Sequence, residues 1–310
     1  MSSSLYVAER GAGPKTVVFL HGFGGCHGDW HEVISTLAPG SRTLAYDLPG
    51  HGLCLDFPGG GPARTAARAV LADLAARRIR RVHLVGHSMG GAAAVLMALA
   101  EPARIASLTL LAPGGFGTEI NGPLLRRYAA AAGKSEIRAC LAAMSGPQSP
   151  PSERIVDVLG AMRARPGQLH KLVEIAAAMT RDDRQGVIPR ERLETLAMPV
   201  IVVWGTEDAV LPFSQADGLP AHFHLHHVSE AGHMLVEEAP GLIAEIVRRN
   251  MKRRSRPLRP NAAPAAADPR QSAASGRILQ AAYRSRNCIL LHFASDCVNS
   301  VLTKPARQRR

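Results

Sequence analysis

Aromatic side chains and long apolar runs are both scarce in this chain of 310 residues. Phe, Trp and Tyr make up 4% of it while hydrophobic residues make up 46%, so alanine, leucine and valine must fill most of the core. No apolar run approaches the ~20 residues that a bilayer-spanning helix needs. The opening stretch, MSSSLYVAERG, has no basic region followed by an apolar one, so we expect no secretory signal. These absences predict a cytoplasmic protein without a membrane span, built around a large α/β domain.

Cysteine is also sparse, and no pair of cysteines has the spacing of a metal-binding motif. The five cysteines lie at positions 26, 54, 140, 288 and 297, an odd and scattered set. This argues against a disulfide framework and a zinc site, and it favours reduced thiols. The histidines of HFHLHHV (222–228) alternate along a predicted strand without a Cys or carboxylate at ligand spacing, so we interpret them as a solvated strand face. We expect neither a metal nor another cofactor.

The net charge of +12 is concentrated at the end of the chain. From Arg248 onward there are 15 Lys and Arg and 2 Asp, whereas residues 1–247 hold 22 basic and 23 acidic residues. A neutral body excludes a basic globular face, so we expect no specific nucleic-acid partner. Residues 251–310 are rich in Pro, Ala and Arg, and we expect a disordered basic extension there. Attachment of this extension to nucleic acid or to a membrane surface is an alternative.

Apolar strand patterns alternate with helical patterns along the chain. Each strand pattern is a short, largely apolar run that stops at Gly or Pro, as buried strands do. ARTAARAVLADLAARR (63–78), in contrast, has apolar residues at helical spacing. The alternation predicts an α/β fold with a mostly parallel, doubly wound sheet. The predicted strands are TVVFLHG (16–22), RTLAYDLPG (42–50), RVHLVG (81–86), ASLTLLAPGG (106–115), PVIVVWG (199–205) and FHLHHVSEAG (223–232).

The strand pattern disappears between residues 115 and 192. This stretch contains short helical segments broken by Gly and Pro, such as SEIRACLAAM and QLHKLVEIAAAMTRDD. A helical insertion between two strands of one sheet would cap the carboxyl ends of the strands, where ligands bind in such sheets. We therefore predict an α/β core at 1–114 and 193–250, a helical cap at 115–192 and the extension at 251–310.

The stretch LVGHSMGG (84–91) places Ser88 between glycines at a predicted strand-to-helix turn. Gly86, Gly90 and Gly91 allow a sharp bend that holds the serine side chain out of the fold, where substrate can reach it. The same position lies at a helix N-terminus, whose N–H groups favour a developing negative charge. We predict that Ser88 is a nucleophile. The alternative is a glycine-rich turn that only connects the two elements.

A serine nucleophile needs a base, and the base needs an orienting carboxylate. Asp208 follows the predicted strand VIVVWG, and His233 lies in a Gly-flanked loop after the last strand. The order Ser, Asp, His is that of the α/β hydrolases. We predict a triad of Ser88, Asp208 and His233, although each of the last two alone would also suit a turn or a loop. The nearby acidic residues are interpreted as solvated loop charges: Glu207, Glu230, Glu237 and Glu238.

The stretch LHGFGG (20–25) follows the first strong strand and provides a flexible loop beside the predicted nucleophile. We predict that the oxyanion hole consists of the backbone N–H groups of Phe23 and Met89. His21 is interpreted as shaping this loop. His87, the neighbour of Ser88, is interpreted as structural.

These stretches, together with YDLPGHG (46–52), WGTEDAVLP (204–212) and AGHM (231–234), resemble the α/β-hydrolase superfamily over residues 5–247. SLTLLAPGGFGTEING (107–122) and the cap are similar to meta-cleavage C–C hydrolases and, more closely, to the acyltransferase component of acetoin dehydrogenase systems. The lipoyl domain of such acyltransferases has no counterpart in these residues. Members of the superfamily usually have a further strand before the one at LYVAER, which has no counterpart in these residues, so we expect a sheet of seven strands or fewer. A serine nucleophile argues against epoxide hydrolase or dehalogenase chemistry.

The sequence therefore predicts a serine hydrolase that cleaves a small ester, thioester or related carbonyl substrate through an acyl-enzyme. The expected partner is a small acyl substrate. Two alternatives stay open: an acyltransferase-like protein, and a non-catalytic protein that binds a small ligand on the same scaffold. Neither the substrate nor the oligomeric state can be derived from the sequence.

Overall fold

The strands predicted from the apolar runs form one sheet in the computed structural model, which describes residues 4–37 and 40–254. Seven strands lie in the order β1-β3-β2-β4-β5-β6-β7. All neighbours are parallel except β1, which pairs antiparallel with β3. The predicted α/β-hydrolase fold with a mostly parallel sheet is confirmed. The strands are β1 (Val7–Arg10), β2 (Lys15–Leu20), β3 (Ser41–Tyr46), β4 (Val82–His87), β5 (Ile105–Leu111), β6 (Val200–Gly205) and β7 (His224–Val228).

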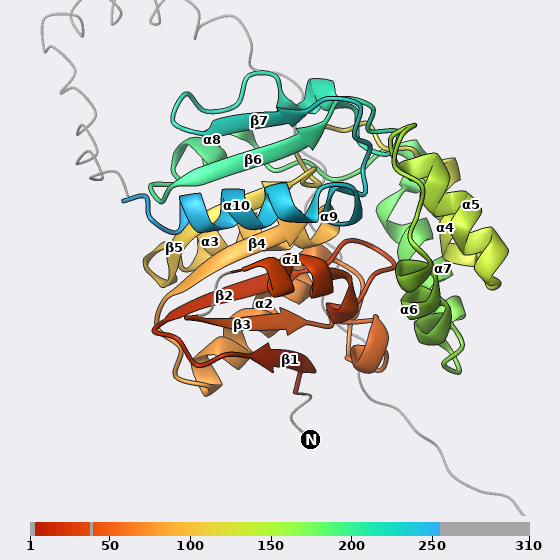
Figure 1. The fold of residues 1–310 in the computed structure, drawn as a ribbon, viewed down its shortest axis with the longest axis horizontal. Coiled ribbons are helices and arrows are strands. Elements are labelled where there is room, and N and C mark those ends of the chain that lie inside the picture. The colour runs from red at the N-terminus through yellow and green to blue at the C-terminus, as the bar shows by residue number, and fades with distance from the viewer. Residues whose placement is uncertain (1–3, 38–39, 255–310) are drawn as a thin grey trace, which may run out of the picture. The chain divides into compact units, whose positions relative to one another are not determined.

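Helices cover both faces of this sheet (Figure 1). On one face α2 (Ala63–Ala76) packs against α3 (Met89–Ala100), and on the other α1 (His31–Thr36) packs against α10 (Pro240–Asn250). The central strands are buried from both sides: every residue of β6 is inaccessible or nearly so. This double burial explains why those strands appear in the sequence as continuous apolar runs rather than as alternating ones. The exposed residues of β7, at one edge of the sheet, include His224, His226 and His227, as the prediction of a solvated strand face requires.

The chain between β5 and β6 forms helices that gather beyond one end of the sheet (Figure 1). The apolar residues of these helices, including Leu125, Ile137, Leu159 and Leu172, are buried. The neighbours along this cluster are α4 with α5 and α7, and α5 with α6. The longer helices are α4 (Gly122–Ala130), α5 (Lys134–Met144), α6 (Glu153–Arg163) and α7 (Gln168–Met179), followed by the short α8 (Arg190–Glu194).

Short 3-10 segments complete the described elements. Two of them, η1 (His27–Trp30) and η2 (Gly52–Cys54), follow β2 and β3, and η4 (Arg181–Asp183) follows α7. The others are η3 (Pro102–Arg104) and η5 (Phe213–Ala216), and the short helix α9 (Leu235–Glu238) precedes α10.

Among the described residues, no helix has the length and apolar character that crossing a membrane would require. The division into core, cap and extension stays a prediction. From residue 255 on, the predicted extension lies outside the described residues.

Candidate active site

Ser88 occupies a strained turn between β4 and α3. Its φ and ψ angles are 51° and −117°, a conformation that L residues rarely adopt. The turn is possible because its neighbours lack a side chain: a Cβ at Gly86 would lie 2.5 Å from the carbonyl oxygen of Gly90. A Cβ at Gly90 would lie 2.2 Å from the carbonyl oxygen of Leu20 on β2. The glycines therefore let the elbow pack tightly on the sheet, as the sequence predicted.

Backbone hydrogen bonds fix the elbow to the end of β5, to the loop after β5 and to the first turn of α3. The Ser88 N–H donates to the Leu111 carbonyl (2.9 Å), and the Ser88 carbonyl accepts from the N–H groups of Ala92 and Gly114 (both 3.0 Å). All three bonds involve backbone only, so the hydroxyl takes no part in holding the turn. The strained conformation, which costs about 1–3 kcal/mol in general, persists because the surrounding structure fixes it.

The structure joins the other two residues predicted for the triad. Nδ1 of His233 lies 2.8 Å from Oδ2 of Asp208, and their side chains are only 4% and 0% exposed. The second carboxylate oxygen accepts from the N–H groups of Val210 (2.9 Å) and Leu211 (2.8 Å). Since an ionised carboxylate can only accept, Nδ1 of His233 carries the proton and Nε2 is left as the basic nitrogen.

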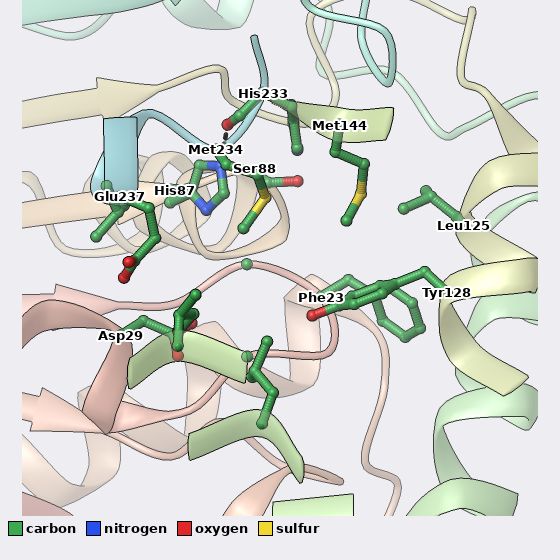
Figure 2. Close-up of a pocket in the computed structure, with 15 residues that line it drawn as sticks. Phe23, Asp29, His87, Ser88, Leu125, Tyr128, Met144, His233, Met234 and Glu237 are labelled. Atoms are coloured by element: carbon green, nitrogen blue, oxygen red, sulfur yellow. Dashed lines mark hydrogen bonds between the residues drawn. The ribbon is translucent and has the colours of Figure 1, made fainter. Parts of the chain in front are cut away.

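Ser88 and His233 line the same small cavity, to which the cap helices contribute Leu125 and Met144 (Figure 2). Within the described residues, the Ser88 hydroxyl forms no hydrogen bond with the His233 ring. The cavity measures about 30 Å³. One water needs roughly 10–15 Å³ by this measure, so the space suits a group of a few heavy atoms.

The two residues predicted to supply the oxyanion hole line different spaces that both reach Ser88. Phe23 lines the cavity with Ser88, while Met89 is the first residue of α3 and lines an adjoining cleft. Neither N–H has a hydrogen-bond partner within residues 4–37 and 40–254. The helix N-terminus at Met89 adds a favourable dipole.

His21 ties the Phe23 loop to the chain that follows β3. Its Nδ1 donates to the Gly22 carbonyl (2.7 Å), and its Nε2 accepts from the Leu48 N–H (2.9 Å). Burial lowers the pKa of His21, which keeps the ring neutral and able to accept. This is the loop-shaping role predicted from the sequence.

His87 supports the loop that carries His233. Its Nε2 donates to the His233 carbonyl oxygen (2.8 Å), and the two rings are 4.9 Å apart between centroids (Figure 2). Burial lowers the pKa of His87 to about 3, so the ring stays neutral. The structural interpretation of His87 fits these contacts.

Two carboxyl groups in the cavity were not predicted as part of the site. Asp29, on η1, faces the cavity, and burial raises its pKa to about 7 (Figure 2). Glu237, on α9, also lines the cavity, and burial raises its pKa as well, although Arg154 binds it at 2.7 Å. The prediction that Glu237 is a solvated loop charge is wrong, because its side chain is only 12% exposed.

The neighbouring Glu238 also has a structural role instead of the predicted solvated one. Its Oε2 accepts from the N–H groups of Gly146 (2.8 Å) and Gly232 (2.9 Å). It thereby links the end of α5 to the loop that carries His233. Glu207 and Glu230 are exposed, as expected.

Helix α4 supplies Tyr128 to the cavity wall (Figure 2). Its hydroxyl donates to the Gly24 carbonyl (3.4 Å), and the Arg163 guanidinium lies 4.1 Å from its ring centroid. Burial raises the pKa of Tyr128 to about 12, so the phenol is protonated at neutral pH. No sequence signal marked Tyr128, Asp29 or Glu237, because each reaches the site through long-range packing.

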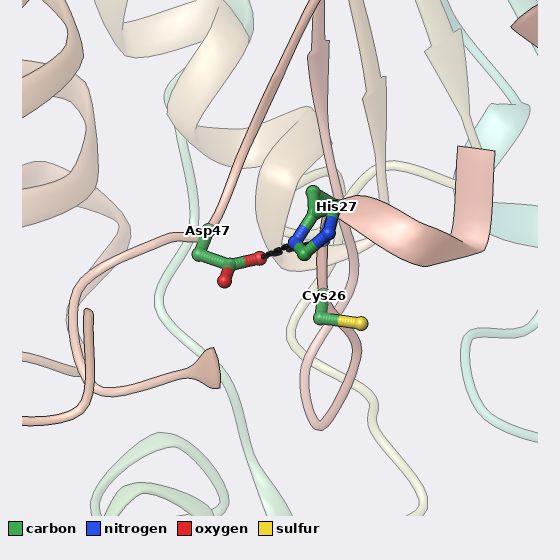
Figure 3. Close-up of side chains that lie close together, drawn as sticks. All are labelled: Cys26, His27 and Asp47. Atoms are coloured by element: carbon green, nitrogen blue, oxygen red, sulfur yellow. Dashed lines mark hydrogen bonds and ion pairs between the residues drawn. The ribbon is translucent and has the colours of Figure 1, made fainter. Parts of the chain in front are cut away.

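A second cluster of potential ligand atoms lies nearby: Cys26, His27 and Asp47 present one such atom each within 4.8 Å of one another (Figure 3). Asp47 is already fully engaged, because its oxygens accept from the His27 ring (2.8 Å), the His27 N–H (2.7 Å) and the Leu53 N–H (2.8 Å). Burial raises the pKa of the Cys26 thiol, which disfavours the thiolate that a metal would need. We interpret the cluster as structural, because its hydrogen bonds connect the segment after β2 with the segment after β3.

Comparison with known proteins identifies the family. The model of the alpha/beta hydrolase family matches residues 17–246. This chain belongs to the alpha/beta hydrolase family. The chain is 34% identical over 231 residues to the dihydrolipoyllysine-residue acetyltransferase component of the acetoin cleaving system of Pseudomonas putida. That match covers 74% of the chain but 61% of the relative, so the chain spans less than two thirds of it.

Other relatives of this chain are named as hydrolases. A 2-hydroxy-6-oxononadienedioate/2-hydroxy-6-oxononatrienedioate hydrolase of Cupriavidus pinatubonensis is 28% identical, covering 74% of the chain and 84% of the relative. A solved meta-cleavage product hydrolase of Pseudomonas fluorescens IP01 superimposes with a TM-score of 0.70 at 19% identity, covering 79% of this chain and 93% of that one. At that identity the structural likeness supports the fold alone.

Proposed function

We propose that this protein is a serine hydrolase that cleaves small acyl esters or thioesters through an acyl-enzyme. The observation that carries the proposal is the buried hydrogen bond between Asp208 and His233, whose ring lines one cavity with the strained Ser88. That arrangement contains a nucleophile, a base and a group that orients the base.

In the proposed reaction, Oγ of Ser88 attacks the carbonyl carbon while Nε2 of His233 takes the hydroxyl proton. Asp208 holds the ring tautomer and stabilises the imidazolium. The carbonyl oxygen becomes negative and accepts hydrogen bonds from the N–H groups of Phe23 and Met89, each worth roughly 2.7–4 kcal/mol of barrier in comparable sites. The leaving oxygen or sulfur receives the proton from His233. A water activated by His233 then hydrolyses the acyl-enzyme.

The hydrogen bond from the serine to the histidine is often long in a free enzyme and shortens when substrate is bound.

The size of the cavity favours a short acyl group. A space of about 30 Å³ accommodates an acetyl-sized group more readily than a long chain. The wall formed by Leu125, Met144 and Tyr128 closes it on the cap side. Activity should therefore fall as the acyl chain of a p-nitrophenyl ester is lengthened.

The test compares the wild-type protein with Ser88→Ala on p-nitrophenyl acetate. We expect a burst of p-nitrophenol from the wild type, equal to the enzyme concentration, and no burst from Ser88→Ala. Undiminished turnover by Ser88→Ala would refute the assignment.

A second candidate function is transfer of the acyl group to a thiol. It is favoured by the similarity to the acetyltransferase component, although the chain spans only 61% of that relative. Both functions share the acyl-enzyme and differ in what accepts the acyl group. Adding a thiol acceptor during turnover separates them: transfer predicts an acylated thiol in place of free acid.

A further inference from the structure

Ser88 also lines a second and much larger cleft, which measures about 800 Å³ against about 30 Å³ for the cavity it shares with His233. The cleft lies among α2, the start of α3, the chain after β5, the end of α7 and the chain from η4 to Ile188. A group attached to the acyl carbon could therefore extend from Ser88 into a space large enough for a substantial molecule.

The lining of this cleft is strongly cationic. It contains Arg64, Arg68, Arg181 and Arg184 and no carboxylate. All four arginines are exposed, and none forms an ion pair within the described residues. Four guanidinium groups around a cleft whose lining holds no carboxylate give it a positive potential, which favours binding of an anion.

The arginines are placed in two pairs. Arg64 and Arg68 are four residues apart on α2, so both project from one face of that helix. Arg181 and Arg184 lie in and after η4. Two carboxylates lie between them in sequence: Asp183 binds Arg126 at 2.8 Å, and Asp182 forms no ion pair within the described residues. Arg184 makes one weak contact, from Nη2 to the Thr118 hydroxyl at 3.4 Å.

The N-terminus of α2 adds a second source of positive potential. Its N-cap is Pro62, which has no side chain able to accept a hydrogen bond, and Gly61, Pro62 and Ala63 all line the cleft. The first intrahelical bonds come from Thr65 and Ala66, so the N–H groups of Ala63 and Arg64 have no partner within residues 4–37 and 40–254. A helix N-terminus with unpaired N–H groups binds phosphate and carboxylate.

From this geometry we infer that the substrate carries a multiply charged anion, a phosphate ester or carboxylates, on the leaving group, held by Arg64, Arg68, Arg181 and Arg184. The inference rests on the proposed function and specifies its substrate class: a short acyl group joined to an anionic carrier. The arginines bind and orient the carrier. They take no part in the bond changes at the carbonyl carbon, where the C–O or C–S bond breaks and the proton passes from His233 to the leaving atom.

The experiment uses three acetyl thioesters that share the reacting bond. Acetyl-CoA carries phosphates, S-acetylglutathione carries carboxylates, and S-acetyl-N-acetylcysteamine is neutral. The wild type should show a higher kcat/KM for at least one anionic thioester than for the neutral one, and salt should reduce that advantage. Whichever anionic thioester has the higher kcat/KM shows whether the site prefers phosphates or carboxylates.

Two double variants, Arg64→Ala/Arg68→Ala and Arg181→Ala/Arg184→Ala, then locate the effect. Each should lower kcat/KM for the preferred anionic thioester at least tenfold, mainly through KM, and change that of the neutral thioester less than twofold. Arg248→Ala, an exposed arginine on α10, is the matched control and should change neither. Equal losses on the charged and neutral thioesters, or no loss on either, would overturn the inference.

A binding measurement separates this inference from the proposed function. In the Ser88→Ala background, calorimetric titration with free CoA and with glutathione disulfide should show binding of at least one, weakened at least tenfold by either double variant. This holds even if Ser88 is not the nucleophile. Absence of binding of both anions at low salt, or binding that the double variants leave unchanged, would refute the anion site while leaving the hydrolase assignment standing.

Discussion

Two histidine–aspartate pairs in this protein share the same contact distance and differ in what surrounds them. In each pair, Nδ1 of the ring lies 2.8 Å from a carboxylate oxygen: His233 with Asp208, and His27 with Asp47. The His233 ring is buried and lines a cavity with Ser88, whereas the His27 side chain is 31% exposed and its nearby thiol, Cys26, has a pKa raised by burial, which disfavours the reactive thiolate. The same hydrogen bond is therefore present in both pairs, and we expect a catalytic base only at His233, whose ring lines a cavity with Ser88.

The two carboxylates differ as well. Asp208 receives two N–H groups of its own turn, which orient it toward one histidine. Asp47 receives N–H groups from two separate segments, at His27 and Leu53, and so links them. Although burial pushes its pKa upward, the hydrogen bond from the His27 ring holds the pKa of Asp47 below its usual value. One pair is therefore expected to serve activity and the other stability.

The largest difference should appear when each histidine is removed. We expect His233→Ala to lower kcat on p-nitrophenyl acetate by about 10⁴- to 10⁶-fold, because the hydroxyl of Ser88 loses its base. His27→Ala should keep kcat within about tenfold of wild type, because the ring contacts no reacting group. Far-UV circular dichroism would verify that both variants are folded. Equal loss of activity in the two variants would contradict the assignment of a catalytic role to His233 and a structural role to His27.

Replacing each aspartate by asparagine changes charge with little change of shape. Asp208→Asn should lower kcat by about 10⁴-fold, because the histidine tautomer is no longer fixed. Its free energy of unfolding should change less than that of Asp47→Asn. Asp47→Asn should instead lower the free energy of unfolding by about 1–3 kcal/mol, through weakened hydrogen bonds in a buried position. Kinetics and urea unfolding measured on the same preparations give both quantities. A stable, fully active Asp208→Asn protein would argue against a triad.

The elements and the triad candidates could be predicted because their signals are local. Continuous apolar runs mark buried parallel strands, and the small residues around Ser88 mark a sharp turn. Asp208 and His233 were found because each follows a strand, and parallel strands bring their carboxyl ends to one edge of the sheet. The burial of Glu237 could not be predicted, because it depends on α6 supplying Arg154 from 83 residues away.

The same limit explains Asp29, Tyr128 and the arginine cleft. No sequence pattern marks Asp29. It lines the cavity because α6 and α9 pack against η1, the segment that carries it. Arg64 and Arg181 are distant in sequence, and each alone is typical of a solvated helix face. Their convergence depends on how the segment after α7 returns toward α2, which no local pattern encodes.

The smallest expected effect is the pH dependence of the structural pair. The hydrogen bond to Asp47 raises the pKa of His27 in the folded state. A raised pKa means that the pair stabilises fully below about pH 6.5, the unfolded value, and that this stabilisation is lost as pH rises through the folded pKa. At the acid end, the lowered pKa of Asp47 means stabilisation above about pH 4 that is lost as pH falls further.

The free energy of unfolding of wild type should therefore exceed that of His27→Ala most between about pH 4 and 6.5, and the excess should shrink toward pH 8. Urea unfolding at several pH values provides the comparison. An excess that stays constant or grows from pH 6 to pH 8 would show that the charge on His27 does not contribute.

The measurement that tests the central claim most directly is active-site labelling. A fluorophosphonate reacts only with an activated serine, and peptide mass spectrometry then locates the adduct. We predict a single adduct on Ser88, absent in Ser88→Ala and slowed at least a hundredfold in His233→Ala, with His27→Ala labelled at the wild-type rate. Labelling of another serine, or none on Ser88 in the folded wild-type protein, would contradict the account.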